Sequence, residues 1–318
     1  MSQDWKSDVT KFPRFEGVRT FMRLPYDPEP KGVDVVILGA PFDTTATFRT
    51  GARFGPEAVR RISSLLRPAH AYHAVRPTDV LKIVDGGDIP VIPGNTLRSY
   101  RYITDVIHSW VNAGAIPITL GGDHGIALAE LRALAQVHGP LALIQFDAHL
   151  DTWDEYWEEK YTHGTPFRRA LEEGLLDPLR STQIGIRGTV YDPADIEEGR
   201  SLGFEVLTAE KVREIGLEQT IRTAIERAGS AKTFVSFDVD FLDPAYAPGT
   251  GTPEIGGFTT FEAQQLLRKL YPLDFVGFDI VEVLPAFDPT ETTALAGATV
   301  AFEFLSLVAS GRKGASSS

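Results

Sequence analysis

The chain has 318 residues, of which 43% are hydrophobic and 23% are charged, as in an average globular protein, so wholesale disorder is excluded. Its 31 basic and 43 acidic residues give a formal net charge of -12, which offers no general attraction for nucleic acid or for an anionic membrane surface. There are no cysteines, so disulfides, thiolate zinc sites, iron–sulfur clusters and a cysteine nucleophile are all excluded.

Short apolar segments recur along the chain, bounded by Gly, Pro and Asp and rich in β-branched and aromatic residues. Such segments are typical of buried parallel strands. The predicted strands are 33–38, 81–84, 115–120, 141–146, 183–186, 233–237 and 275–281.

Longer segments with helical spacing of apolar residues separate these strands. Pro56 and Glu57 open one of them, and Thr259 or Thr260 followed by Glu262 is a start signal for another. The predicted helices are 58–66, 96–113, 126–137, 208–228 and 259–270.

Alternating strands and helices predict an α/β fold, a single-domain three-layer α/β/α arrangement around a mostly parallel sheet. No linker or repeat divides residues 1–318, and we expect frayed ends at about 1–12 and 311–318. The first residues lack the apolar run of a signal peptide, and no stretch of about 18 uncharged apolar residues predicts a membrane span. We therefore expect a cytoplasmic protein that does not bind membranes or nucleic acid.

Three predicted strands end in clusters of acidic and histidine side chains, and ligands bind at this edge of a parallel sheet. In extended chain, residues two apart project to the same side, so Asp147 converges with His149, and Asp238 with Asp240. The clusters contain His124 after the third strand, Asp147, His149 and Asp151 after the fourth, and Asp238 and Asp240 after the sixth.

So many carboxylates in one dry place would repel each other strongly unless cations were bound among them. Two divalent ions would balance four carboxylates, with the two imidazoles completing the coordination. Oxygen and imidazole ligands without sulfur suit Mn²⁺, with Ni²⁺, Co²⁺, Fe²⁺ or Zn²⁺ as alternatives. Any one Asp after a strand is more often a turn former or helix cap, and any one His an ordinary interior or surface residue. The coincidence of three such clusters favours a metal site.

The same residues resemble a known family, the ureohydrolases, which include arginases and agmatinases. Similar segments extend from Phe42 to Thr299, so the resemblance covers nearly the whole chain. The motifs are Gly121-Gly-Asp-His124, Asp147-Ala-His-Leu-Asp151 and Ser236-Phe-Asp-Val-Asp-Phe-Leu-Asp-Pro244, with Arg49-Thr-Gly-Ala-Arg-Phe-Gly-Pro56 and Ala247-Pro-Gly-Thr-Gly-Thr-Pro-Glu-Ile-Gly-Gly257 in support.

The resemblance implies the arginase/deacetylase fold and a binuclear metal centre that hydrolyses a guanidino C–N bond and releases urea. Asp147 and Asp238 would bridge the two ions. One ion would be held by these two residues with His124 and Asp151, and the other by the same two with His149 and Asp240. Family members are commonly trimers or hexamers, so a homo-oligomer is expected.

Two further residues match catalytic positions of the family. His163, in Tyr161-Thr-His163-Gly-Thr-Pro-Phe167, would act in proton transfer, and its ordinary pKa near 6.5 suits that task. Glu282 would hold the planar guanidinium through a charge-assisted pair. Asp123, beside His124, is predicted to orient that ligand.

The substrate within the family stays open. Trp153 stands where arginases have an Asn that binds the amino-acid head group, which favours agmatine, converted to putrescine and urea, over arginine. Guanidinobutyrate and guanidinopropionate have anionic tails and would require a basic residue such as Arg49, Arg53 or Lys160, and free guanidine is a further alternative. An aromatic cluster could line the substrate channel or pack beneath a loop, and its members are Trp153, Tyr156, Trp157 and Tyr161.

Two alternatives belong to other classes of protein. A binuclear metallophosphoesterase also uses Asp-x-His motifs, but it requires further histidines on later strands, and none follows His163. A catalytically silent relative that serves as a binding protein would be expected to have lost a metal ligand. We expect the four remaining histidines to lie at the surface, namely His70, His73, His108 and His138.

Overall fold

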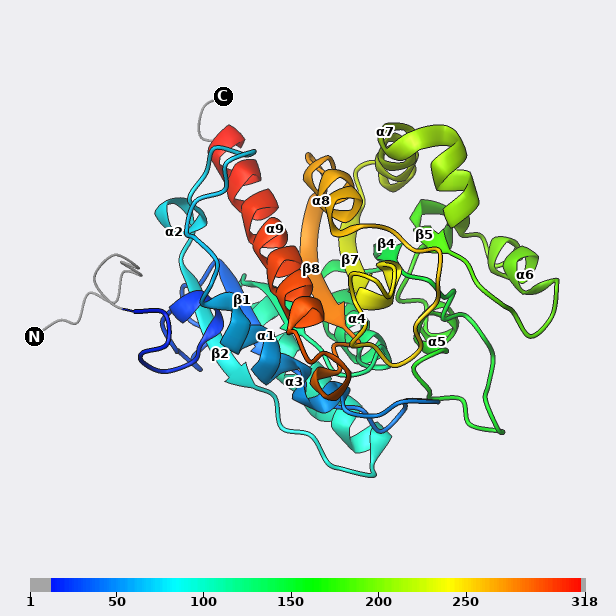
Figure 1. The fold of residues 1–318 in the computed structure, drawn as a ribbon, viewed down its shortest axis with the longest axis horizontal. Coiled ribbons are helices and arrows are strands. Elements are labelled where there is room, and N and C mark those ends of the chain that lie inside the picture. Colours follow the sequence, from blue (N-terminus) through cyan, green and yellow to red (C-terminus); the bar gives the residue numbers. More distant parts are fainter. Residues whose placement is uncertain (1–12, 316–318) are drawn as a thin grey trace, which may run out of the picture.

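The computed structural model describes residues 13–315. Eight parallel strands form one sheet in the order β2-β1-β3-β8-β7-β4-β5-β6 (Figure 1). Their bounds are β1 Val35–Gly39, β2 Ile83–Asp88, β3 Ile116–Leu120, β4 Ala142–Phe146, β5 Thr182–Ile186, β6 Glu205–Thr208, β7 Lys232–Asp238 and β8 Asp274–Val281.

Helices cover both faces of this sheet (Figure 1). One hydrophobic core packs α1, α7, α8 and α9 against one face, and a second core packs α3, α4 and α5 against the other. The helices are α1 Gly55–Ser63, α2 Pro77–Val80, α3 Thr96–Asn112, α4 Ile126–His138, α5 Pro166–Glu172, α6 Asp195–Ser201, α7 Ala209–Ala228, α8 Thr260–Arg268 and α9 Thr292–Ala315. The predicted three-layer α/β/α fold with a parallel sheet is confirmed.

Each predicted strand and helix is present, with ends shifted by a few residues. Thr259 begins α8 through a capping box, in which its hydroxyl accepts from the Glu262 amide while the Glu262 carboxylate accepts from the Thr259 amide. The sequence analysis did not predict β6, which has only four residues, or the short helices α2, α5 and α6. It also did not predict α9, which is the longest helix of the described chain.

Helix α9 escaped prediction because it is apolar on nearly every side and so lacks an alternating polar face. The part from Thr292 to Lys313 is long and apolar enough to cross a membrane, but 72% of its most apolar window is buried inside this protein. It is therefore a core helix, as its position against the sheet in Figure 1 shows. It continues to Ala315, so residues 311–315, expected to belong to a frayed end, are helical. Residues 1–12 and 316–318 lie outside the described part.

His70 is not a surface residue, contrary to our expectation, because it is buried beside α9. Its Nδ1 accepts a hydrogen bond from the His73 amide at 3.2 Å, so its Nε2 has the proton and donates to Glu303 at 2.8 Å. Arg268 donates to the other oxygen of Glu303 at 2.7 Å. Although His70, His73 and Glu303 lie close enough to hold an ion, His70 therefore has no free lone pair to offer, and the cluster ties α8 to α9 instead.

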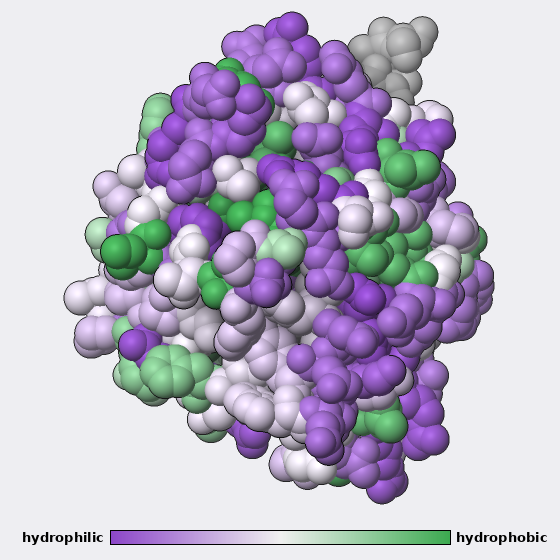
Figure 2. Space-filling view, turned by 90° about the vertical axis from the view of Figure 1, so that its right-hand side faces the viewer, coloured by the Kyte–Doolittle hydropathy of each residue, from purple (hydrophilic) through white to green (hydrophobic). Residues whose placement is uncertain are grey.

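The centre of the sheet positions the functional residues. Strands β3, β8, β7 and β4 are neighbours, although β3 and β4 lie far from β7 and β8 in the sequence. Since all four strands are parallel, their C-terminal ends meet at one edge, where the acidic and histidine clusters follow. Figure 2 shows one side of the molecule, mainly hydrophilic, with small separate hydrophobic patches.

Candidate metal centre and substrate cavity

A tight turn between β3 and α4 places His124. Gly122 lies so close to the Phe42 backbone that a Cβ atom would overlap its carbonyl group, so only glycine fits. Asp123 accepts hydrogen bonds from the Thr45 amide at 2.8 Å, the Thr45 hydroxyl at 2.6 Å and the Gly125 amide at 3.0 Å. Asp123 therefore anchors the turn that carries His124 to the segment at Thr45.

Asp147, His149 and Asp151 follow β4. Asp147 accepts from the His149 amide at 2.6 Å through one oxygen and from Gln145 Nε2 at 2.7 Å through the other. Asp151 has a φ of 52°, a left-handed conformation that non-glycine residues seldom adopt, and the turn directs it back toward His124.

Asp238 and Asp240 follow β7. One Asp238 oxygen accepts from the Asp240 amide at 2.8 Å, and one Asp240 oxygen accepts from the Ala148 amide at 3.1 Å. The second bond joins the end of β7 to the end of β4, so a hydrogen bond from a backbone amide to a side-chain carboxylate holds the two clusters together.

The side chains of all six predicted ligands converge. His124 Nδ1 lies 2.8 Å from an Asp151 oxygen, 3.1 Å from Asp147 and 3.4 Å from Asp238. His149 Nδ1 lies 3.0 Å from an Asp240 oxygen and 3.5 Å from Asp147. Asp147 therefore lies close to both histidines, His124 and His149.

The close atoms are not aligned as hydrogen-bond partners. His124 Nδ1 and Asp240 Oδ2 are buried and, within the described chain, have no partner that satisfies hydrogen-bond geometry. Two groups have ligand atoms within 4.8 Å of one another, His124 with Asp147 and Asp151, and Asp147 with His149 and Asp240. Ligand atoms that lie this close together without hydrogen-bonding to each other fit divalent cations, and the oxygen and imidazole donors suit first-row metals.

Burial and mutual repulsion raise the pKa values of carboxylates in this cluster. Burial, followed by the Asp147 charge, raises the pKa of Asp151 to about 6. Burial and the neighbouring Asp240 and Asp147 charges also raise the pKa of Asp238 well above its ordinary value. Asp147 differs because, although burial acts to raise its pKa, the adjacent His124 and His149 rings outweigh this effect and lower it. A cluster with this much uncompensated negative charge favours cations.

His163 and Glu282, predicted from the family resemblance, contact each other beside this cluster. His163 Nδ1 lies 2.8 Å from Glu282 Oε1, which also accepts from the His124 amide at 3.0 Å. Glu282 has a φ of 63° and is buried, and its Oε2 has no hydrogen-bond partner among the described residues. That oxygen is therefore available to a bound cation, while the first oxygen holds His163.

Burial acts against protonation of His163, but the adjacent Glu282 carboxylate raises its pKa to about 8. On the other side of the ring, Nε2 of the neutral imidazole accepts from the Thr47 amide at 3.1 Å, and it lies 2.6 Å from the Thr47 hydroxyl. Sequence analysis missed Thr47, because nothing in the local pattern indicates that its loop packs against His163.

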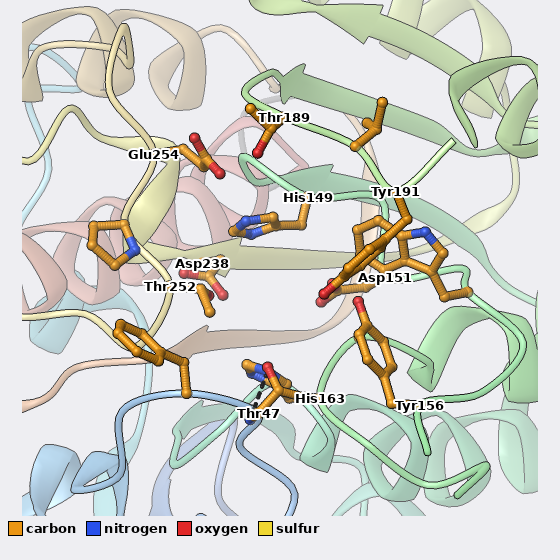
Figure 3. A pocket seen from close by; sticks show the side chains of 15 residues that line it. Thr47, His149, Asp151, Tyr156, His163, Thr189, Tyr191, Asp238, Thr252 and Glu254 are labelled. Carbon is orange, nitrogen blue, oxygen red and sulfur yellow. Dashed lines mark hydrogen bonds between the residues drawn. The ribbon is translucent and has the colours of Figure 1, made fainter. Parts of the chain in front are cut away.

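A cavity of about 350 Å³ opens beside these residues. Figure 3 shows His149, Asp151, Asp238 and His163 around it. Tyr156 and Tyr191 lie on one side and Glu254 on the other. The lining also includes Thr47, Phe48, Trp153, Gly164, Thr189, Val190, Thr252 and Pro253.

Only two of the four residues in the predicted aromatic cluster line the cavity. Trp153 and Tyr156 line the cavity and pack edge-on against each other and against Tyr191, which sequence analysis missed. Trp157 is 77% exposed and Tyr161 packs on Tyr100, and neither lines the cavity.

No lysine or arginine lines this cavity in the described chain. Arg49 stacks on Phe287 and donates to the Thr250 carbonyl at 3.4 Å. Arg53 is paired with Asp43, and Lys160 is exposed outside the lining. The carboxylate of Glu254 is thus the charged group that faces the centre from the far wall.

A parallel α/β sheet with paired carboxylate and histidine clusters at its C-terminal edge defines a metal-dependent hydrolase. The Arginase family model matches residues 33–306, and the chain belongs to this family. The chain is 50% identical to guanidinopropionase of Pseudomonas aeruginosa, over 95% of each sequence. It is 44% identical to agmatinase of Neisseria meningitidis, over 90% of this chain and 92% of the relative.

Solved structures agree with this assignment. Proclavaminate amidinohydrolase from Streptomyces clavuligerus has a TM-score of 0.91 and 40% sequence identity, covering 94% of this chain and 100% of that one. A formiminoglutamase variant from Trypanosoma cruzi, solved with Mn²⁺, has a TM-score of 0.79 and 25% identity, covering 87% and 94%. The protein is therefore an arginase-family amidinohydrolase, and the metallophosphoesterase alternative is excluded.

Proposed function

We propose that this enzyme hydrolyses agmatine to putrescine and urea. The supporting observation is the charge of the cavity, where Glu254 faces the metal-ligand cluster and no lysine or arginine of the described residues lines the wall. A substrate with a guanidinium at one end and an ammonium at the other would find a carboxylate at each, Glu282 and Glu254. The aromatic rings of Trp153, Tyr156 and Tyr191 suit the apolar chain between them.

We assign the metal ligands as the family resemblance implies. One ion would be held by His124, Asp147, Asp151 and Asp238, and the other by Asp147, His149, Asp238 and Asp240. Mn²⁺ is the proposed ion, because the donors are oxygen and imidazole and because the Trypanosoma cruzi relative was solved with Mn²⁺. When bound, such ions lower the pKa of water and so supply a nucleophile at neutral pH.

The protein's own residues would then complete the reaction. Glu282 Oε2, which lacks a partner, would bind the guanidinium and orient its central carbon. Water adds its oxygen to that carbon, the bond from carbon to the alkyl nitrogen breaks, and this nitrogen takes up a proton as it leaves. We assign the delivery of this proton to His163, and the support is that it lines the cavity and contacts Glu282 and Thr47.

Urea release from agmatine, guanidinobutyrate, guanidinopropionate, arginine and guanidine, measured with Mn²⁺ varied, tests the proposal. We expect the highest kcat/KM for agmatine and no release after chelation. A higher kcat/KM for any other compound would refute the choice of agmatine, and full activity of the chelated protein would refute the metal assignment.

A guanidino acid is the second candidate, favoured by the 50% identity to guanidinopropionase. Glu254→Gln separates the two. If the tail is an ammonium, the variant should raise KM for agmatine about tenfold, the value of one charge-assisted contact. If the tail is a carboxylate, the loss of a repelling charge should instead lower KM for guanidinopropionate.

We also propose a cytoplasmic homo-oligomer, a trimer or hexamer, that acts in polyamine metabolism. The support is the family membership and the choice of substrate. Light scattering on the purified protein tests the assembly, and a monomer at all concentrations would overturn it.

A further inference from the structure

A row of buried polar side chains crosses the sheet directly beneath the metal-ligand cluster. Strand register places Thr119 beside Asp279, Asp279 beside Ser236, Ser236 beside Gln145, and Gln145 beside Gln183. All five residues are fully buried. Ser236 and Gln145 each precede a predicted ligand by two residues and therefore share its side of the strand.

This row supports the ligands through hydrogen bonds. Gln145 donates to Asp147 at 2.7 Å, and Gln183 donates to Gln145 at 2.6 Å. The Ser236 hydroxyl lies 2.7 Å from Asp279 Oδ1 and 2.8 Å from His124 Nε2. When Asp279 is ionised it can only accept, so Ser236 donates to it and accepts from the Nε2 proton of His124. That tautomer leaves the lone pair of Nδ1 free for an ion.

The row ends at a second buried acid, Glu130 of α4, whose carboxyl faces the Asp279 carboxyl and the Thr119 hydroxyl. No basic side chain of the described chain forms an ion pair with Glu130 or Asp279, unlike the buried acid Glu303. Four atoms here have no hydrogen-bond partner, namely Thr119 Oγ1, Asp279 Oδ2, Glu130 Oε1 and Glu130 Oε2.

Two ionised carboxylates cannot hydrogen-bond to each other, and leaving both charged in a dry interior would be costly. A single proton on the pair supplies a hydrogen-bond donor and removes one of the two buried charges. With that proton on Glu130, one Glu130 oxygen donates to Asp279 Oδ2, and Asp279 keeps its charge for Ser236. Two of the four unpartnered atoms, one Glu130 oxygen and Asp279 Oδ2, are then paired.

We propose that Glu130 and Asp279 share a single proton, and that this acid pair is a positioning device that holds Ser236 and His124 in the metal-binding tautomer. Burial and the Asp279 charge raise the pKa of Glu130 well above its ordinary value, in agreement with this arrangement. The proposal rests on the metal assignment made above, but neither substrate nor turnover is needed to test it.

The first test compares Glu130→Gln, Glu130→Met and Asp279→Asn by Mn²⁺ titration, with free Mn²⁺ followed by electron paramagnetic resonance. Gln has the donor and the acceptor that a neutral Glu130 offers, so it should bind Mn²⁺ within about threefold of the wild type. Met leaves Asp279 Oδ2 unpaired, so Asp279 takes up the proton itself and becomes a weak acceptor for Ser236. Asp279→Asn removes the charge outright, and both variants should bind one ion about 10–100-fold more weakly.

The second test detects the proton directly. The infrared difference between the wild type and Glu130→Gln at pH 8 should contain the carbonyl band of one protonated carboxylic acid. Glu303→Gln is the matched control, a buried acid outside the row, and it should leave both this band and Mn²⁺ affinity unchanged.

Three results would contradict the shared proton. Absence of the protonated-acid band, an equal loss of Mn²⁺ affinity in Glu130→Gln and Glu130→Met, or unchanged affinity in Glu130→Met would each overturn the proposal. Failure of agmatine as a substrate would affect none of these measurements, so an error in the proposed substrate is distinguishable from an error here.

Discussion

The His163 ring lies between the Glu282 carboxylate, which contacts Nδ1, and the loop at Thr47, which contacts Nε2. Glu282 contacts Nδ1 and raises the pKa of His163 to about 8, so the ring is protonated at neutral pH and loses its proton as the pH rises above about 8. His163→Ala should therefore lower kcat by about 10²–10³ with little change in KM, because general acid catalysis is lost while substrate binding is kept. Steady-state kinetics from pH 6 to 9 measure this.

The same series checks the role of the proton. The wild-type contribution from His163 should decline above about pH 8, and the variant should lack that decline. Wild-type turnover of His163→Ala throughout the neutral range would show that His163 is not the proton donor.

Asp147 is the ligand common to both groups of metal-binding side chains. Asp147→Asn removes the charge and one acceptor lone pair facing the centre while keeping the size of the side chain. We expect loss of paired Mn²⁺ binding and of turnover, which metal analysis and urea release measure. Asp238→Asn should behave alike, whereas Asp88→Asn, at the end of β2 and outside the cluster, should retain two ions per chain. Two tightly bound ions in Asp147→Asn would contradict the bridging assignment.

At the scale of elements, a buried ion pair joins α8 and α9. Burial acts to raise the pKa of Glu303, but His70 and Arg268 outweigh it and hold the pKa below its ordinary value. A lowered folded-state pKa means that the pair stabilises the fold above the unfolded value of 4.5 and that this contribution is lost as the pH falls below it.

Glu303→Gln should lower the free energy of unfolding by about 3 kcal/mol at pH 7, because His70 and Arg268 lose a buried partner. Urea denaturation at pH 7 and pH 4 measures the difference between variant and wild type, which should shrink at the lower pH. A difference that is the same at both pH values would show that the charge of Glu303 is not what stabilises the helix pair.

For the whole molecule, the metal centre joins the ends of β3, β4 and β7, which belong to distant parts of the chain. Ions that bind only the folded protein stabilise it by mass action, about 2.7 kcal/mol for one site at a hundred times its Kd. Mn²⁺ should therefore raise the Tm of the metal-free protein by about 5 °C. Differential scanning calorimetry measures this, and an equal rise in Asp147→Asn would assign the effect to binding elsewhere.

The local spacing of apolar and capping residues predicted most of the strands and the longer helices. The strands were found because short apolar runs ended in Gly, Pro or Asp, and α8 because Thr259 and Glu262 form a capping box. Helix α9 was missed because a helix buried on nearly all sides has no polar stripe, and β6 because four residues show too little alternation. His70 was misassigned because its partner, Glu303, is 233 residues away.

The sequence alone determined which residue types stand at the end of each strand. Because side-chain direction alternates along a strand, the spacing of Asp147 and His149 already places this pair on one side, and the same holds for Asp238 and Asp240. Only the tertiary structure decided which strands are neighbours. Thr47, Tyr191, Glu254 and the pair of Glu130 with Asp279 come from separate segments, and they meet because β8 and β7 lie between β3 and β4. Strand order follows from how the helices pack on the two faces of the sheet, and local periodicity does not encode that packing.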